Sequence, residues 1–145
     1  MDIKDCLERG YLALETPATD LIEKEIKESE YDLARAESAL KDKDGKWAII
    51  KSYYSMFHAA KAVCFKAGYR EKKHLAILIL LEELNKKGKL ENKFVNYFTA
   101  AIQAREGADY HYNYSIDKAA SLLHLAKEFN LRMKLLIKDV SPILF

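Results

Sequence analysis

The stretch that decides the fold is Lys46 to Ala67, KWAIIKSYYSMFHAAKAVCFKA, near the middle of the 145-residue chain. Its apolar and aromatic side chains surround a helix axis almost completely instead of forming one stripe. A helix of this kind is buried by several neighbouring helices or by a partner chain. Ala59, Ala60 and Ala62 let another backbone come close, and Gly68 is placed to cap the carboxyl end. We therefore expect this segment to be the central helix of a bundle.

Helical patterns continue on both sides of the central segment. Prolines occur only at positions 17 and 142 and strand-like alternation is almost absent, so the chain is predicted to be all-α. Helices are expected at about residues 2–14, 19–41, 46–67, 75–84, 91–105 and 116–138. Thr19 and Asp20 are candidate amino-terminal caps. Residues 75–84 could be a strand in isolation, but no second strand is available to pair with them. The predicted fold is an antiparallel up-and-down bundle of four main helices with one or two short extra helices.

Composition restricts the function only weakly. A chain of this length with half of its residues apolar is expected to form one domain with a real core. The net charge is +2, but residues 70–145 hold 13 basic and 9 acidic side chains, a weak lean toward anionic partners. We expect a cytoplasmic protein without a membrane span, because a signal-like leader and an apolar run of about 20 residues are both lacking. Cys6, Cys64, His58 and His74 have no partner at metal-ligand spacing, so neither a metal nor a cofactor is predicted and both histidines are expected to be structural.

One segment concentrates chemically active side chains, namely residues 104–114, AREGADYHYNY. Arg105 and His111 are six positions apart, which on one helix is about 240° of rotation and about 9 Å of rise, so their side chains would point apart. Gly107 lies between them and costs about 1 kcal/mol relative to alanine inside a helix. We therefore expect the helix to stop near Arg105 and a turn to bring His111 back toward the guanidinium. A pair held in this way can bind a phosphate and move a proton.

Several short motifs together resemble the HEPN domain family, whose name stands for higher eukaryotes and prokaryotes nucleotide-binding. The motifs are YYSMFHAAKA at residues 53–62, Gly68-Tyr69, a lysine before His74, and Arg105 followed by Ala108-Asp109-Tyr110. The resemblance covers roughly residues 20–138. It implies one helical bundle domain over residues 1–145 with its core at about 20–138, and it also implies pairing into a homodimer.

The resemblance also implies an activity. Many HEPN proteins are metal-independent ribonucleases with the signature arginine, four to six residues, histidine, and many are toxins encoded beside a nucleotidyltransferase antitoxin. Arg105, five residues and His111 fit this spacing, although Glu106 stands where the ribonucleases often have an uncharged polar residue. The first hypothesis is an endoribonuclease or RNA-binding toxin with Arg105 and His111 as catalytic residues. RNA or a nucleotide would be bound by one acid and three tyrosines of the same segment: Asp109, Tyr110, Tyr112 and Tyr114.

Each of these residues also has a structural interpretation. Arg105 could cap its helix or pair with Asp109, and His111 could be an exposed loop histidine. The tyrosines could stack on unpaired bases, or they could pack within a dimer, with Tyr110 against the bundle. The alternative function is a non-catalytic helical module that binds a nucleotide or a partner protein.

Overall fold

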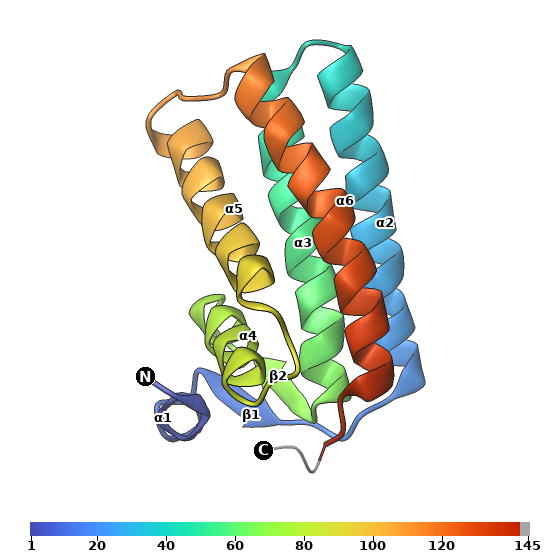
Figure 1. Ribbon diagram of the computed structural model, residues 1–145, viewed down its shortest axis with the longest axis vertical. Helices are drawn as coiled ribbons and strands as arrows, with labels where there is room; N and C mark the ends of the chain where they lie inside the picture. The colour runs from blue at the N-terminus through green and yellow to red at the C-terminus, as the bar shows by residue number, and fades with distance from the viewer. Residues whose placement is uncertain (143–145) are drawn as a thin grey trace.

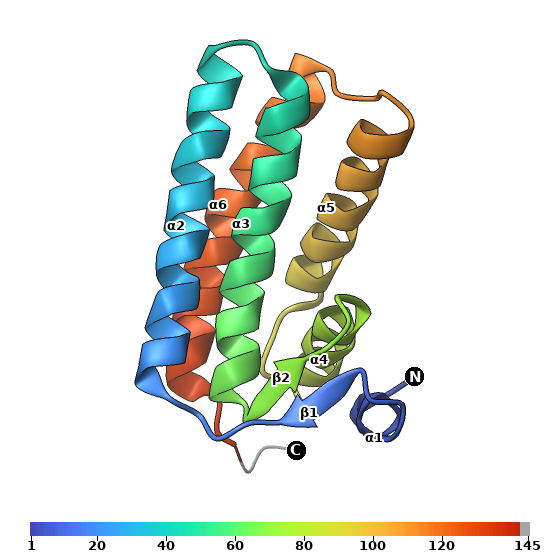
Figure 2. The same ribbon diagram turned by 180° about the vertical axis from the view of Figure 1, so that it is seen from behind.

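Figure 1 shows the computed structural model of the protein, which describes residues 1–142. Along these residues the elements are α1 (Ile3–Glu8), β1 (Leu12–Leu14), α2 (Thr19–Lys41), α3 (Gly45–Lys66), β2 (Tyr69–Glu71), α4 (Leu75–Lys86), α5 (Asn92–Tyr110) and α6 (Ile116–Asp139). The long helices α2, α3, α5 and α6 run alternately up and down, and α3 packs against the other three (Figures 1 and 2). The predicted all-α up-and-down bundle is confirmed.

The central segment forms α3, and fifteen of its 22 residues are buried. The helix begins where the Asp44 carboxylate accepts a hydrogen bond from the backbone N–H of Trp47, at 3.0 Å. It is followed by Gly68, whose φ of +95° favours glycine, as the predicted cap requires. Trp47 departs from the expectation of burial all round, because it is 44% exposed. The reason is its position in the first turn of α3, at the end of the bundle where the neighbouring helices stop (Figure 1).

The amino-terminal segment was predicted to be one helix over residues 2–14, and this prediction is wrong. Helix α1 is only six residues long, and the chain then turns at Gly10, whose φ is +75°. Residues 12–14 form strand β1, which pairs antiparallel with β2 so that Leu12 lies opposite Glu71 and Leu14 opposite Tyr69. Three-residue strands are too short to show an alternating pattern. The candidate caps Thr19 and Asp20 also fail, because the capping position of α2 is Ala18, without a side-chain hydrogen bond.

Helix α5 does not stop near Arg105. It continues through Gly107 to Tyr110, so the predicted break is wrong. Ala108 is fully buried, which keeps the last turn packed on the bundle. The backbone oxygen of Gly107 accepts the N–H groups of His111 and Asn113, at 3.1 and 2.9 Å, and these bonds end the helix. The packing of the final turn therefore offsets the helical cost of the glycine.

The loop between α5 and α6 returns over the amino-terminal end of α3. At Gly45, the first residue of α3, an added Cβ would overlap the carbonyl oxygen of Tyr114. Only glycine permits this approach of the two backbones. Helix α6 then begins at the cap Ser115, whose hydroxyl accepts the N–H of Lys118 at 3.2 Å. The loop that carries the predicted tyrosines is therefore fixed at its far end against α3.

Candidate functional site

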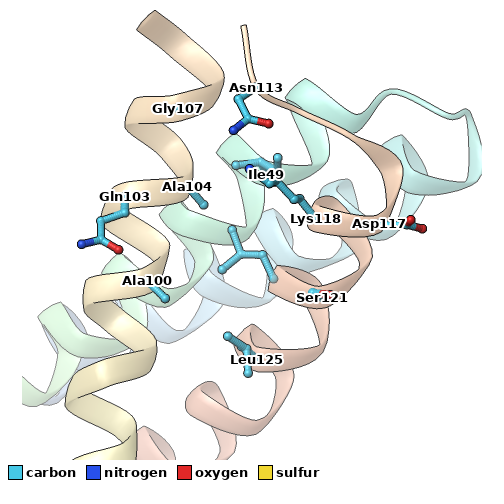
Figure 3. A pocket seen from close by; sticks show the side chains of 11 residues that line it. Ile49, Ala100, Gln103, Ala104, Gly107, Asn113, Asp117, Lys118, Ser121 and Leu125 are labelled. Atoms are coloured by element: carbon cyan, nitrogen blue, oxygen red, sulfur yellow. The ribbon is translucent and has the colours of Figure 1, made fainter. Parts of the chain in front are cut away.

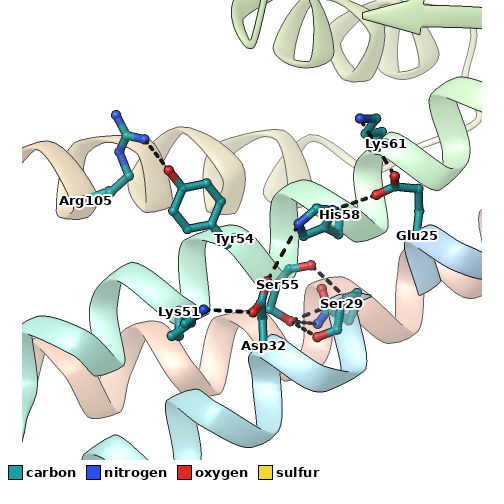
Figure 4. A network of polar contacts seen from close by, with 10 residues as sticks. Glu25, Ser29, Asp32, Lys51, Tyr54, Ser55, His58, Lys61 and Arg105 are labelled. Carbon is teal, nitrogen blue, oxygen red and sulfur yellow. Dashed lines mark hydrogen bonds and ion pairs between the residues drawn. The ribbon is translucent and has the colours of Figure 1, made fainter. Parts of the chain in front are cut away.

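Arg105 lies on the side of α5 that faces α3, and two tyrosines of α3 hold it. Its Cζ lies 4.9 Å from the ring centroid of Tyr53 and 5.9 Å from that of Tyr54. Its Nη1 donates a hydrogen bond of 3.3 Å to the hydroxyl oxygen of Tyr54 (Figure 4). Cation–π contacts of this kind fix a guanidinium without neutralising its charge. The side chain stays 22% exposed, so solvent still reaches it.

Asp109 is one helical turn beyond Arg105 and faces the same way. The distance from Arg105 Nε to Asp109 Oδ2 is 3.8 Å, which is an ion pair but too long for a hydrogen bond. The carboxylate is 31% exposed. The predicted pairing of Arg105 with Asp109 is therefore present, but it leaves the guanidinium with donors that the described part of the chain does not use.

A histidine that the sequence did not connect with Arg105 lies at the other end of Tyr53. The Nδ1 atom of His74 is 3.2 Å from the Tyr53 hydroxyl oxygen, and its ring packs on Phe57 with centroids 4.3 Å apart. Burial raises the pKa of Tyr53 to about 12, although Arg105 acts against this rise. Tyr53 therefore keeps its proton at neutral pH. Its hydroxyl and the ring nitrogen of His74 form a hydrogen bond that links α3 to the start of α4.

His111 is not directed toward Arg105 of the same chain. It is the carboxyl-terminal capping residue of α5 and is exposed, and its backbone N–H donates to Gly107. Because α5 is continuous, a rotation of about 240° separates the two side chains, so they point about 120° apart and lie about 9 Å apart along the helix axis. The prediction that a turn brings them together within one chain is wrong.

The three tyrosines of the segment all lie on the surface. Tyr110 is 68% exposed, Tyr112 is 77% exposed and Tyr114 is 40% exposed. The expectation that Tyr110 packs against the bundle is therefore wrong. Tyr112 also has a φ of +53°, a conformation that is uncommon outside glycine and marks the tightest point of the loop. Three exposed aromatic rings at one end of the bundle leave a surface that nothing in residues 1–142 covers.

A cavity of about 460 Å³ lies between α5 and α6, next to this loop (Figure 3). Its floor is apolar and includes Ile49 of α3 and Leu122 of α6. Polar side chains stand at its rim, among them Asn113 and Lys118. Arg105 does not line it, because α5 presents positions 100, 103, 104 and 107 to the cavity and Arg105 to the tyrosines of α3.

A polar network between α2 and α3 was not predicted from the sequence (Figure 4). His58 lies between two acids, with Nδ1 2.6 Å from Glu25 Oε2 and Nε2 3.7 Å from Asp32 Oδ2. Lys51 pairs with Asp32 at 3.2 Å, and Lys61 lies 3.8 Å from Glu25. The expectation that His58 is structural agrees with this environment, because both of its nitrogens face carboxylates.

Behind these charges the network continues as hydroxyl and amide groups. The Ser29 hydroxyl donates to the Ser55 carbonyl at 2.8 Å, and the Ser55 hydroxyl donates to the Ser29 carbonyl at 2.7 Å. Asn130 of α6 donates its Nδ2 to the Ser55 hydroxyl oxygen at 2.8 Å. The sequence does contain a sign of this network, because polar residues recur at steps of four and then three on both helices, which places them on one face of each helix. They are Glu25, Ser29 and Asp32 on α2 and Lys51, Ser55 and His58 on α3.

Within residues 1–142 no helix combines the length and apolarity that crossing a bilayer requires. In the same residues, no group of three or more His, Cys, Asp or Glu side chains is arranged to hold a metal ion.

The protein is a small helical bundle in which an arginine is held near the end of α5. Comparison with known sequences gives its family. The family model for the HEPN domain matches residues 22–136. The chain belongs to the HEPN domain family, as the motifs in the sequence indicate.

Two relatives from archaea support this assignment. The protein named "Putative toxin MJ0142" of Methanocaldococcus jannaschii is 32% identical over 106 residues, which are 71% of this chain and 72% of the relative. The UPF0332 protein PH1297 of Pyrococcus horikoshii is 35% identical over 80 residues, 54% of this chain and 56% of the relative. The chain is thus similar to a protein whose name describes a toxin, over most of the length of both.

Proposed function

We propose that this chain is a metal-independent endoribonuclease of the toxin type, in which Arg105 binds the scissile phosphate of RNA. The observation that carries the proposal is the placement of Arg105. The guanidinium rests on two tyrosine rings, contacts its nearest acid only at 3.8 Å and remains accessible to solvent. A cation that is fixed but not neutralised is suited to stabilise charge that develops on a phosphate.

The reaction would be attack by an RNA 2′-hydroxyl on its own phosphodiester. Arg105 stabilises the charge on the phosphate oxygens, and His111 transfers a proton. Because His111 leaves α5 on a different side from Arg105, it would reach that phosphate from a second copy of the chain. The proposed enzyme is therefore a homodimer with composite sites. Tyr110, Tyr112 and Tyr114 would stack on unpaired bases, which single-stranded RNA offers.

The toxin assignment also suggests a partner and a setting. We propose that the homodimer acts in the cytoplasm and that a nucleotidyltransferase antitoxin holds it inactive. Support comes from the family and from the name of the Methanocaldococcus relative. Asp109 would tune the site by competing with phosphate for Arg105, since their ion pair is long and exposed.

The test is cleavage of single-stranded RNA by the purified protein in the presence of a chelator. Arg105→Ala should lower the rate by about 10²–10³-fold, the usual effect of removing one group that stabilises transition-state charge. Arg35→Ala is the matched control, because Arg35 is exposed on α2 and far along the chain from the site. Its rate should equal that of the wild type. If the wild-type protein cleaves no RNA, the enzymatic proposal fails, and a non-catalytic module that binds a nucleotide or a partner protein takes its place.

The composite site has its own test. Arg105→Ala and His111→Ala chains, each inactive alone, are mixed in equal amounts under conditions that let subunits exchange. Half of the dimers are then mixed, and each mixed dimer keeps one intact site out of two. About a quarter of the wild-type activity should return if the two residues come from different chains. Mixed samples that remain inactive, although exchange is demonstrated, contradict the composite site.

A further inference from the structure

A second histidine lies beside Arg105, although it is 31 positions earlier in the chain. His74 immediately precedes α4, and its Nδ1 is 3.2 Å from the hydroxyl oxygen of Tyr53. The guanidinium of Arg105 lies over the ring of the same tyrosine, with Cζ 4.9 Å from its centroid. One aromatic ring therefore positions both side chains, the arginine on its face and the imidazole at its hydroxyl.

We propose that Arg105 and His74 form one phosphate-binding site, in which the His74 Nε2–H donates to one phosphate oxygen and the guanidinium binds another. The ligand class is the phosphate of a ribonucleotide, either as a diester in RNA or as a monoester. The inference rests on the proposed function, because it names the groups that hold the phosphate at the Arg105 site. His111 of a second copy keeps the proton-transfer role.

The proposed site uses one particular neutral tautomer of His74. In it the Tyr53 hydroxyl, which keeps its proton at neutral pH, donates to Nδ1 of His74, so Nδ1 is the unprotonated nitrogen. In the neutral imidazole the proton then lies on Nε2. This Nε2–H has no acceptor among residues 1–142, since Tyr53 is the hydrogen-bond partner of the ring. The fold thus leaves a donor that is oriented by its neighbours and available for a ligand.

The surrounding charges favour a neutral imidazole. Burial lowers the pKa of His74, and Arg105, Lys61 and His58 lower it further, while Glu71 alone raises it. Glu71 is itself paired with Lys61 at 3.0 Å, so it does not supply a free negative charge beside the ring. At neutral pH the site therefore combines one full positive charge, on Arg105, with one neutral donor.

The proposal requires that one phosphate group reach both donors. Hydrogen bonds of about 2.8 Å to two oxygens of the same phosphate join donors that are up to about 8 Å apart. Both side chains contact the same tyrosine, the guanidinium over its ring at 4.9 Å and the imidazole at its hydroxyl at 3.2 Å. Lys72 and Lys73, just before His74, are exposed and add positive charge along the approach.

The first measurement uses the wild-type protein and needs no substitution. Long-range ¹H–¹⁵N NMR spectra distinguish the two neutral tautomers of a histidine, and His74→Gln identifies the His74 signals. We expect a protonated Nε2 and an unprotonated Nδ1 at a pH slightly above neutral. A spectrum with the proton on Nδ1 overturns the proposal, because Nε2 would then have nothing to donate.

The second measurement titrates the protein with inorganic phosphate and, separately, with a ribonucleoside 3′-monophosphate. The His74 Nε2 and Arg105 Nε signals should shift together and saturate at the same ligand concentration. His74→Ala should weaken binding by about 10- to 100-fold, the usual effect of losing one hydrogen bond to a charged group. His74→Gln should bind almost as well as the wild type, because a glutamine amide places a donor where Nε2–H lies. His124→Ala, an exposed histidine of α6, is the control and should change nothing.

The results separate this inference from the proposed function. If phosphate shifts both signals but the protein cleaves no RNA, the phosphate-binding site is supported and the enzymatic proposal is refuted. If His74→Ala cleaves RNA and binds phosphate as well as the wild type does, the enzymatic proposal is supported and the role of His74 in phosphate binding is refuted. Loss of cleavage in both His74→Ala and His74→Gln, without loss of phosphate binding, also refutes the donor role and assigns proton transfer to His74.

Discussion

Substitution of two buried serines of α3 by alanine is expected to have opposite effects on stability, although the serines are three residues apart on the same helix. Ser52 and Ser55 are both fully buried. The Ser55 hydroxyl donates to the Ser29 carbonyl and accepts from Asn130, at 2.7 and 2.8 Å. The Ser52 hydroxyl has no hydrogen-bond partner among residues 1–142. Replacing each serine with alanine therefore removes the same atom from two different environments.

The expected magnitudes follow from these contacts. Ser55→Ala removes two hydrogen bonds of about 1 kcal/mol each and leaves the Asn130 amide buried without a partner, which costs about 1–3 kcal/mol more. Asn130 is only 5% exposed and its Oδ1 already lacks a partner in the described part of the chain, so water does not readily replace Ser55. We expect a loss of about 3–5 kcal/mol in the free energy of unfolding. Ser52→Ala should leave stability unchanged or raise it by up to about 1 kcal/mol, because an unpaired hydroxyl is removed.

The assay is urea unfolding followed by far-UV circular dichroism, at one protein concentration, because pairing of chains would make stability depend on concentration. The helix propensity gained on changing serine to alanine is the same for both variants, so it cancels in their difference. Equal losses for Ser52→Ala and Ser55→Ala would refute the reasoning, since they would mean that the hydrogen bonds of Ser55 contribute nothing beyond its volume.

Two further predictions concern the core and the pH dependence of stability. Phe57→Ala should cost about 3–5 kcal/mol because Phe57 is 5% exposed, whereas Trp47→Ala should cost about 1 kcal/mol or less; equal losses in urea unfolding would contradict the packing of α3. Because the pKa of His74 in the folded protein lies below its usual 6.5, the unfolded chain binds more protons as the pH falls from 6.5 through the folded value, and stability decreases there. His74→Gln should make unfolding curves less sensitive to pH in this window, and an unchanged sensitivity would mean that folding does not lower the pKa of His74.

The sequence predicts the bundle well where the pattern is long. Residues 46–67 are apolar nearly all round and become the central helix, and the predicted helices at 19–41 and 116–138 match α2 and α6 to within a residue. The failures occur where a distant contact decides the local structure. Strand β1 forms only because β2, more than fifty residues away, supplies its hydrogen-bond partner. The three residues of β1 carry no sequence pattern from which this pairing could be predicted.

The site is predictable only in part, for a similar reason. Arg105 is recognisable from its sequence neighbourhood, and the fold places it in an accessible aromatic cluster. Asp109 of the same segment lies beside it, but its other neighbours in space are Tyr53, Tyr54 and, through Tyr53, His74, which lie outside that segment. Arg105 and His111 are close along the chain, but on a continuous helix their side chains point to different sides. Long-range packing therefore determines which histidine lies beside the arginine.

The continuity of α5 can be tested directly at Gly107. A Cβ added there would meet Asn113 at 3.7 Å, an ordinary contact, and the backbone of this residue is helical. Gly107→Ala should therefore stabilise the protein by about 0.5–1 kcal/mol, because alanine lowers the entropy of the unfolded chain and favours the helix.

Gly88→Ala is the matched control. A Cβ at Gly88 meets nothing within 4 Å, but its φ is +73°, so the same substitution should destabilise by about 1 kcal/mol through backbone strain alone. Both free energies come from urea unfolding. If Gly107→Ala destabilises as Gly88→Ala does, residue 107 is a turn rather than a helical position. The helix would then end near Arg105, and His111 of the same chain would again be able to approach the guanidinium.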